Sequence, residues 1–568
     1  MGEERADPGR CVVAEYADGS VRLCPVDERG RPAGPVLTEP SLAAALRARP
    51  GVGRWVWRGT AAAYPRALDA GLRVERCYDV EAAEALLLGH EGRYGRPRSL
   101  SAAWARLRGL PVPEDPPPAA ADSAQPSLFE AGPVPLPGDA DPLEALLAVY
   151  AGQLRRTAAA ERPERMRLLL AAESAGTLVA AEMGRVGLPW RADLHRRMLD
   201  ELLGERYAGG GEPRRLAELA ERVSEAFGGA PVRPDLPADV IRAFARAGIR
   251  LGSTRAWELK EIDHPAVAPL LEYKKLYRIY TAHGWSWLRS WVRDGRFRTE
   301  YLPGGAPSGR WTSNGGGALQ IPRVVRRAVV ADPGWRLVVA DADQLEPRVL
   351  AAVSRDRGLM AAAGDAGDLY TGLALRGFSG DRAHAKLALL GAVYGQTSGD
   401  GLRHLADLRR RFPDAVAYVD EAARAGEQGR LVRTWLGRTC PPAGEQPADW
   451  TEPDAADAGE AVADGAARSG PAARARGRFT RNFVVQGSAA EWALLMLAAL
   501  RRALRDTPAE LVFFQHDEVI VHCPAADAES VRAAVAAAGE EAGRLAFGAT
   551  PVRFPFSTAV VECYADAK

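Results

Sequence analysis

The sequence has few of the features that mark secreted or membrane proteins. It contains six cysteines that lie far apart and form no Cys-x-x-Cys pair: Cys11, Cys24, Cys77, Cys440, Cys523 and Cys563. It shows no signal peptide and no apolar run long enough to span a membrane. These absences argue against a disulfide framework and against a membrane partner. We therefore expect a protein of the reducing cytoplasm.

The chain also lacks an excess of charge of either sign. Lysine and arginine number 74 against 73 acidic residues, so the net charge is +1. A protein of this balance can bind nucleic acid only if its basic residues are gathered locally. Three clusters are present: Arg323, Arg326 and Arg327; Arg409 to Arg411; and Arg474, Arg476, Arg478 and Arg481. A solvated surface is the alternative explanation for any one of them.

Length and pattern together predict an α/β protein of several domains. The 568 residues exceed one core, and 47% hydrophobic residues suffice for several. Residues 1–110 mix short β-like runs with helical stretches and predict a small α/β unit. Residues 111–141 are too rich in Pro and Ala to bury a core and predict a disordered linker. Residues 142–297 are mostly helical, and strands alternate with helices over 298–568.

One segment interrupts the last region. Residues 441–477 carry seven acidic residues between Glu445 and Asp464, and no basic residue precedes Arg468. Such a one-signed stretch without apolar periodicity predicts a mobile acidic insert.

Two acidic motifs carry the candidate chemistry. WRLVVADADQLEPRVLA predicts a strand with Asp341 at its end and a helix that begins near Gln344. LVFFQHDEVIVHC predicts two strands joined by a tight turn, with Asp517 and Glu518 at the tip. Each acid alone is typical of an exposed turn. Two aspartates on rigid strand ends, however, are what a two-metal phosphoryl-transfer site requires.

A third motif, DRAHAKLALLGAVYGQ, predicts a helix. It places Arg382, Lys386, Leu390 and Tyr394 four residues apart, and therefore along one helix face. Arg382 and Lys386 are charged donors suited to a triphosphate, although a solvated face would explain that pair taken alone.

These motifs resemble those of family A DNA polymerases, the bacterial DNA polymerase I class. DADQLEPRVLA is similar to the family's motif A, RAHAKLALLGAVYG to motif B and QHDEV to motif C. SGRWTS with LQIP, and RNFVVQGSAAEW, resemble two further family motifs. All five follow the family's order over about 298–568. The resemblance implies palm and fingers there, with the fingers at about 365–476, a thumb in 142–297, and a 3′–5′ exonuclease-like domain in 1–110.

The resemblance also implies a template-directed DNA polymerase that extends a primer with dNTPs in replication or repair. It implies two Mg²⁺ ions, with Mn²⁺ possible, and a monomer that binds primer-template DNA. By this resemblance, Asp341 and Asp517 bind metal, and Lys386 acts beside them in the chemistry. The nucleotide is contacted by Arg382, Lys386, Gln344 and Leu390, while Glu346 excludes a 2′-hydroxyl and Tyr394 with Gly395 shapes the templating pocket. His516 supports the primer terminus, and DNA is contacted by Arg310, Arg478, Asn482 and Gln486.

The sequence departs from the family pattern at three places. Leu390 stands where the family has an aromatic residue, so stacking against the nucleotide is lost. Asp343 replaces a usual Ser and adds an acid near the metals. The N-terminal strand CVVAEYADGS has Glu15 but no Asp-x-Glu pair, and only Asp79 resembles a later nuclease acid. The exonuclease-like domain is therefore expected to be inactive, and we expect no room for a 5′ nuclease domain before it.

Two other functions share parts of this pattern. A single-subunit RNA polymerase has a similar motif B, but Glu346 at the sugar position favours DNA synthesis. A DNA-binding scaffold without activity would not need Asp341, Asp517 and Lys386 together.

The linker contains one further motif. Gln125 to Phe129 spell QPSLF, which resembles the peptide by which bacterial polymerases bind the sliding clamp. Leu128 and Phe129 are large apolar residues in a stretch that cannot bury them locally, so Gln125, Leu128 and Phe129 are candidate clamp contacts.

Overall fold

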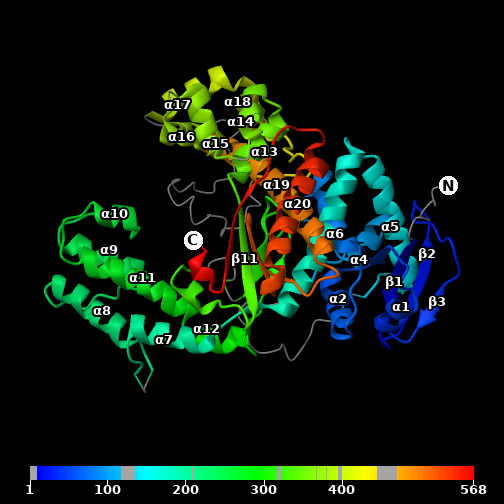
Figure 1. Ribbon diagram of the computed structural model, residues 1–568, viewed down its shortest axis with the longest axis horizontal. Coiled ribbons are helices and arrows are strands. Elements are labelled where there is room, and N and C mark those ends of the chain that lie inside the picture. The colour runs from blue at the N-terminus through cyan, green and yellow to red at the C-terminus, as the bar shows by residue number, and fades with distance from the viewer. Residues whose placement is uncertain are drawn as a thin grey trace. The chain divides into compact units, whose positions relative to one another are not determined.

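The computed structural model describes residues 9–116, 135–207, 210–315, 317, 321–365, 367–378, 380–394, 400–443 and 470–567 (Figure 1). Within 392–394 and 400–405 and at position 471, only the backbone is described. The chain forms two compact units. The first comprises Met1–Arg185, Glu300–Thr312 and Val338–Ala559, and the second Val186–Thr299, Ser313–Leu337 and Val560–Lys568.

The first unit begins with a five-stranded sheet in the order β3-β2-β1-β4-β5. Its strands are β1 (Arg10–Glu15), β2 (Val21–Val26), β3 (Leu37–Glu39), β4 (Arg54–Trp57) and β5 (Cys77–Asp79). Strand β1 pairs antiparallel with β2 and parallel with β4, and β5 is parallel to β4. The helices here are α1 (Leu42–Ala48), α2 (Thr60–Asp69), α3 (Val80–His90) and α4 (Leu100–Arg108). This part of the chain thus mixes strands and helices, and by its contacts it belongs to the larger first unit.

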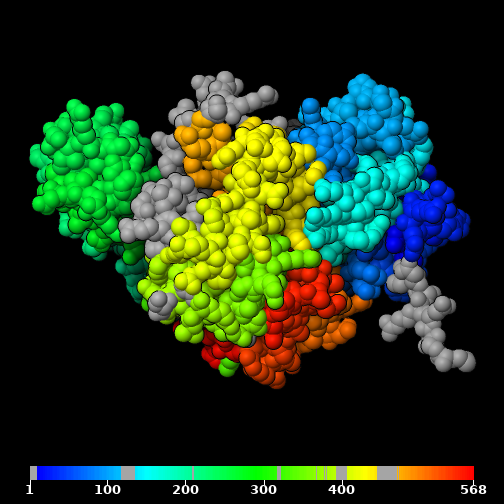
Figure 2. Space-filling view, turned by 90° about the horizontal axis from the view of Figure 1, so that it is seen from above, coloured from blue at the N-terminus to red at the C-terminus, as the bar shows by residue number. Residues whose placement is uncertain are grey.

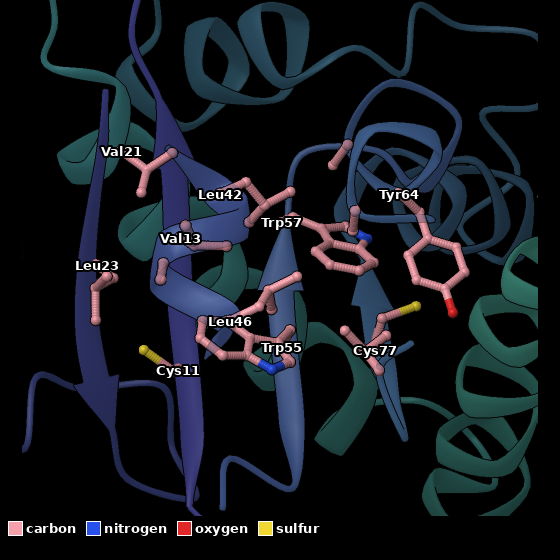
Figure 3. Close-up of a cluster of buried hydrophobic side chains, with 14 of the residues drawn as sticks. Cys11, Val13, Val21, Leu23, Leu42, Leu46, Trp55, Trp57, Tyr64 and Cys77 are labelled. Carbon is pink, nitrogen blue, oxygen red and sulfur yellow. The ribbon is translucent and has the colours of Figure 1, made fainter. Parts of the chain in front are cut away.

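Alternating apolar positions of these strands form a closed core. Cys11 and Val13 on β1 lie on one face with Trp55 and Trp57 of β4 (Figure 3). Tyr64 of α2 closes the same cluster and is fully buried. Because successive strand residues point to opposite faces, this spacing of two residues is what a half-buried sheet requires.

Two long helices extend the first unit. They are α5 (Pro142–Ala158) and α6 (Pro163–Val186). Helix α5 packs on β1, α3 and α4 of the N-terminal sheet region. Residues 142–185, which the sequence pattern grouped with the following helices, thus belong to the first unit by their contacts.

The second unit is mostly helical. Its helices are α7 (Ala192–Leu203), α8 (Arg214–Ala226), α9 (Pro237–Arg246), α10 (Ala256–Lys260), α11 (Val267–His283) and α12 (Trp285–Trp291). Three short strands, β6 (Leu188–Pro189), β7 (Val292–Arg293) and β8 (Arg296–Phe297), form a sheet in the order β6-β8-β7. Phe244 lies fully buried in a core formed around α8, α9 and α11.

A four-stranded sheet in the order β12-β13-β11-β14 positions the candidate site. The strands are β11 (Trp335–Ala342), β12 (Glu510–Gln515), β13 (Glu518–Pro524) and β14 (Phe556–Val561). Helices α19 (Pro471–Ala503) and α20 (Ala528–Phe547) pack on each other, and α20 contacts β13 (Figure 1). Two short strands, β9 (Glu300–Leu302) and β10 (Thr312–Asn314), form a separate pair.

The remaining helices follow β11 along the chain. They are α13 (Leu345–Ser354), α14 (Arg357–Ala363), α15 (Leu369–Gly377), α16 (Arg382–Tyr394), α17 (Asp400–Arg411) and α18 (Pro413–Glu427). Consecutive members of this series pack on one another, and α18 packs on α19.

One helix differs from the expectation that no apolar run is long enough to span a membrane. Among the described residues, Ala472–Ala503 has the length and hydropathy of a span, but 94% of the qualifying window is buried within the protein. Such burial is typical of the central helix of a globular domain.

Candidate active site

The two predicted aspartates lie on adjacent strands. Strand β13 pairs with β11 in the sheet, and the N–H of Ala342 donates to the carbonyl of Asp517 at 3.0 Å. The turn between β12 and β13 is tight, with His516 at a φ of 57° and the N–H of Asp517 bonded to the carbonyl of Gln515 at 2.7 Å. The sheet therefore brings Asp341 and Asp517 side by side, as the strand-end pattern predicts.

The electrostatics of this pair are unfavourable without a counter-charge. Burial, followed by repulsion from Asp341, raises the pKa of Asp517 to about 7, with Arg310 opposing and Glu346 adding to the rise. A cation between the carboxylates would relieve both effects. In the described ranges no cluster of three or more Asp, Glu, His or Cys could hold a metal ion. Two carboxylates are a donor set that Mg²⁺ can use when water and substrate phosphates complete its coordination.

The turn after Asp341 is held by a buried arginine. Arg348 on α13 is fully buried and donates to the carbonyls of Asp343, Ala363 and Gly367 at 3.0, 3.0 and 2.7 Å. It also bonds to the carbonyls of Asp365 and Arg553. No sequence motif indicates a role for Arg348. The feature of the sequence that could have drawn attention to Arg348 is its position among the apolar residues of a predicted helix.

The first turn of α13 carries two of the predicted nucleotide contacts. Gln344, at its N-cap, has a φ of 47°, and its side-chain oxygen accepts from the N–H of Leu369 at 3.3 Å. Glu346 forms an ion pair with Arg310, and the two side chains are only 16% and 19% exposed. Two residues predicted to contact different parts of the substrates thus hold each other in place.

Helix α16 presents the predicted phosphate-binding residues. Arg382 and Lys386 are exposed, and Leu390 is half-buried. Arg382 forms an ion pair with Asp368 and lies 5.7 Å from the ring of Tyr370. Tyr394 ends the helix, but its side chain and all of Gly395 lie outside the described residues.

Tyr370 is a site residue that the sequence analysis missed. It is buried in the first turn of α15, and its pKa is raised to about 12 by burial and then by the charge of Glu346. Only its neighbour Asp368, which caps α15, could have drawn attention to this position.

Helix α19 carries the predicted DNA contacts. Gln486 is 2% exposed, Asn482 is half-buried and Arg478 is exposed. His516, at the hairpin tip, is exposed. The predicted clamp peptide, with Gln125, Leu128 and Phe129, lies outside the described residues, as do positions 444–469 of the acidic insert.

The acids that depart from the family pattern have partners of their own. Asp343 accepts a hydrogen bond from the hydroxyl of Ser557 at 2.6 Å, so one of its oxygens is already used. Glu15 forms an ion pair with Arg66. Asp79 accepts from the backbone N–H of Thr60 at 2.7 Å and of Ala82 at 2.9 Å, which caps α3 and fixes the start of α2.

Two carboxylates on adjacent strands are the kind of donor set that two-metal phosphoryl transfer uses, and α16 separately carries Arg382 and Lys386. A family model of DNA polymerase family A matches residues 247–558. The chain belongs to this family.

Curated relatives agree with this assignment. DNA polymerase I of Chloroflexus aurantiacus is 30% identical over 359 residues, which cover 56% of this chain and 36% of that protein. The thermostable DNA polymerase I of Thermus thermophilus is 29% identical over 328 residues, covering 53% and 37%. The matches thus span about a third of the relatives' length.

A solved structure has the same fold. It is the POL domain of Pol1 from M. smegmatis in complex with DNA primer-template and dNTP, with a TM-score of 0.66 and 18% identity. The alignment covers 98% of this chain and 95% of that chain. The α/β multidomain polymerase architecture expected from the sequence is therefore confirmed.

Proposed function

We propose that the protein is a template-directed DNA polymerase. It would extend a primer 3′-hydroxyl with dNTPs and release pyrophosphate, in replication or repair. The observation that carries this proposal is the meeting of Asp341 and Asp517 on adjacent strands, through the bond from Ala342 to Asp517. The two residues come from distant parts of the sequence, and both belong to motifs of the family.

Asp341 and Asp517 would hold the two divalent ions, Mg²⁺ or Mn²⁺. When bound, such ions supply activation of the attacking hydroxyl and neutralise charge on the leaving pyrophosphate. Arg382 and Lys386 would bind the triphosphate from α16. Arg382 is paired with Asp368, and a phosphate with more charge would compete for it.

The remaining residues would orient the substrates. Glu346, braced by Arg310, would stand against the sugar and exclude a 2′-hydroxyl. Gln486 and Arg310 would contact the nascent base pair, and Tyr394 with Gly395 would shape the templating pocket. Gln344 and Leu390 would line the nucleotide site, while His516, Arg478 and Asn482 would contact primer and template.

Primer extension tests this function directly. We expect incorporation of dNTPs with Mg²⁺ or Mn²⁺, and much slower incorporation of rNTPs. Asp341→Ala and Asp517→Ala should abolish extension but retain primer-template binding, because Lys and Arg contacts carry the affinity. Asp506→Asn, which changes an exposed acid of the same unit, is the matched control. Preferential use of rNTPs would instead indicate an RNA polymerase, and binding without extension by the wild type would indicate a scaffold.

We propose further that the exonuclease-like domain has no nuclease activity. Glu15 is paired with Arg66, and both oxygens of Asp79 accept backbone hydrogen bonds, so neither acid is arranged for a metal. The full chain should degrade single-stranded 3′ ends no faster than its Asp341→Ala variant does. Faster metal-dependent degradation would refute this.

The clamp peptide is a separate proposal. Gln125, Leu128 and Phe129 would dock on a sliding clamp, so that a cytoplasmic, monomeric enzyme is tethered to the DNA it copies. In the full chain, a Leu128→Ala, Phe129→Ala double variant should lose the lengthening of products that the clamp gives to the wild type. Equal product lengths for both proteins would mean that the segment is only a spacer.

A further inference from the structure

A second feature of the first unit lies away from the paired aspartates. It is a cavity of about 390 Å³, lined by the turn between α5 and α6, the end of α13, α18 and the segment 431–437. Figure 2 shows α5 and α6, in cyan, beside the yellow surface that includes this segment. A volume of this size lies within the range of small-ligand sites.

Positive charge is in excess at this cavity. Arg162, Arg165 and Arg433 line it, and Arg355 lies 5.9 Å from the ring of Trp435 on its wall. The pKa of Arg165 is lowered by burial and then by the charges of Arg162 and Arg355. In the part of the chain that the structure describes, Arg162, Arg165 and Arg355 form no ion pair.

The acidic residues nearby do not balance these arginines. Glu161 contacts Arg433 at 3.4 Å but is 67% exposed. Glu491 lies behind the wall, where it accepts hydrogen bonds from Thr434 and from the N–H of Leu436. Its pKa is raised to about 7 by burial, so its charge is partly lost near neutral pH. An anion is therefore the ligand that this cavity favours.

Trp435 gives the cavity a rigid wall. Its backbone N–H donates to the hydroxyl of Ser488 at 3.0 Å, and its indole N–H donates to the carbonyl of Ala546 at 2.7 Å. Arg165 lies 3.5 Å from the ring centroid. Arg165 packs on Trp435 and Arg355 lies more loosely over the same ring, but packing on the indole does not explain the exposed Arg162. Because Arg165 covers the indole, the ligand would be recognised through its negative charge and not by base stacking there.

The cavity is connected to the candidate active site through two helices. Val353, at the end of α13, lines it, and the first turn of the same helix carries Glu346. Ser488 stands two residues from Gln486 on α19. Glu346 and Val353 are seven residues apart on α13, and at 1.5 Å per residue this places the cavity wall about 10 Å along the helix from Glu346.

We propose that this arginine cavity binds a phosphate group of the unpaired DNA strand. The inference rests on the proposed polymerase function, which implies a single strand near the active site. The planar forks of arginine match phosphate oxygens, and several arginines without carboxylate partners suit a backbone contact that reads no sequence. Free nucleotides and pyrophosphate carry the same phosphate chemistry, and the experiment separates them from the strand.

The test compares two primer-templates, one with a long unpaired template overhang and one with a single unpaired nucleotide. Binding is measured by fluorescence anisotropy over a range of salt concentrations. The variant is Arg162→Gln with Arg355→Asn, because Asn tolerates the left-handed backbone of Arg355, whose φ is 57°. Arg29→Gln with Arg47→Gln, two exposed arginines elsewhere in the unit, is a control of equal charge. Melting curves establish that each variant is folded.

We expect the wild type and the control to bind the long overhang more tightly than the short one. The cavity variant should lose this gain, and its logarithmic salt dependence should be shallower by about 0.7 for each phosphate that it no longer binds. An unchanged gain in the variant would overturn the proposal. Two results together would also overturn the proposal, in favour of a free-nucleotide site. In the wild type, dNTP or pyrophosphate would abolish the gain, and the variant would no longer bind that ligand. A wild type that shows the gain but extends no primer would refute the polymerase function alone.

Discussion

Two strand-end aspartates of the first unit, Asp79 and Asp341, have the same local setting and different surroundings. Asp79 ends β5 and precedes α3, and Asp341 stands near the end of β11 and precedes α13. The oxygens of Asp79 are occupied by the N–H groups of Thr60 and Ala82. Asp341 instead lies beside Asp517. Whether such a carboxylate caps a helix or faces a second carboxylate thus depends on which group the tertiary structure places opposite it.

The energetic difference follows from these partners. Burial raises the pKa of Asp79, and its backbone hydrogen bonds oppose that rise because they stabilise the charged form. Burial also raises the pKa of Asp517, and the neighbouring Asp341 adds to the rise. The first arrangement stabilises the charged carboxylate, whereas in the second the two carboxylates repel each other. Substitutions at Asp517 and Asp79 test this contrast directly, and substitutions at Glu491 and Leu390 test burial and nucleotide binding apart from it.

The largest effect is expected for Asp517→Asn. Incorporation of a single dNTP should fall about a thousandfold or more, which corresponds to ~4 kcal/mol of transition-state stabilisation. The free energy of unfolding should stay the same or rise, because repulsion from Asp341 is removed. Rapid-quench incorporation and denaturant unfolding measure the two quantities. Incorporation at the rate of the Asp506→Asn control would show that Asp517 holds no metal.

A substitution at Glu491 tests the effect of burial on a carboxyl group apart from repulsion by a second carboxylate. Its pKa is raised from 4.5 to about 7, with burial as the cause. Between about pH 4.5 and 7, Glu491 therefore keeps its proton in the folded state and has lost it in the unfolded state. The stability that is present below pH 4.5 is lost as the pH rises through this range. The difference corresponds to a loss on the order of 3 kcal/mol.

Glu491→Gln should remove this pH dependence. Unfolding of wild type and variant, compared between pH 4.5 and 8, should show similar stability at the acidic end and a more stable variant at the alkaline end. Parallel pH profiles for the two proteins would contradict the assignment.

A smaller effect, on stability alone, is expected for Asp79→Ala. The buried N–H of Thr60 and the half-buried N–H of Ala82 lose their acceptor, which should cost about 2 kcal/mol of unfolding free energy. Primer extension at a temperature where the variant is folded should be unchanged. Asp79→Asn, which keeps an acceptor oxygen, serves as the control. The structural assignment fails if the wild type has 3′ nuclease activity that Asp79→Ala removes.

The smallest effect concerns the nucleotide and not the metals. Leu390→Phe restores an aromatic ring on α16 and should lower the apparent KM for dNTPs by about two- to tenfold, from the ~0.5–1.5 kcal/mol of a stacking pair. Leu390→Met, similar in size but without a ring, should leave KM near that of the wild type. A KM that Leu390→Phe does not lower would mean that α16 meets the nucleotide through another face.

Much of the site could be predicted because its elements follow short-range patterns. The predicted strand and helix around Asp341 are β11 and α13, the predicted hairpin is β12 and β13, and motif B forms α16. The pairing of Arg310 with Glu346 and the burial of Tyr370 beside them could not be predicted. These contacts join segments with no common periodicity, so no local pattern contains them.

The sequence by itself determined which residues can do chemistry and which elements carry them, because alternation and helical spacing act over a few residues. The tertiary structure alone decided how the acids are used. It placed Asp517 opposite Asp341, gave Asp79 two N–H donors, and attached α5 and α6 to the first unit. The physical reason is that the state of a buried carboxylate depends on the groups packed against it, and these come from distant parts of the chain.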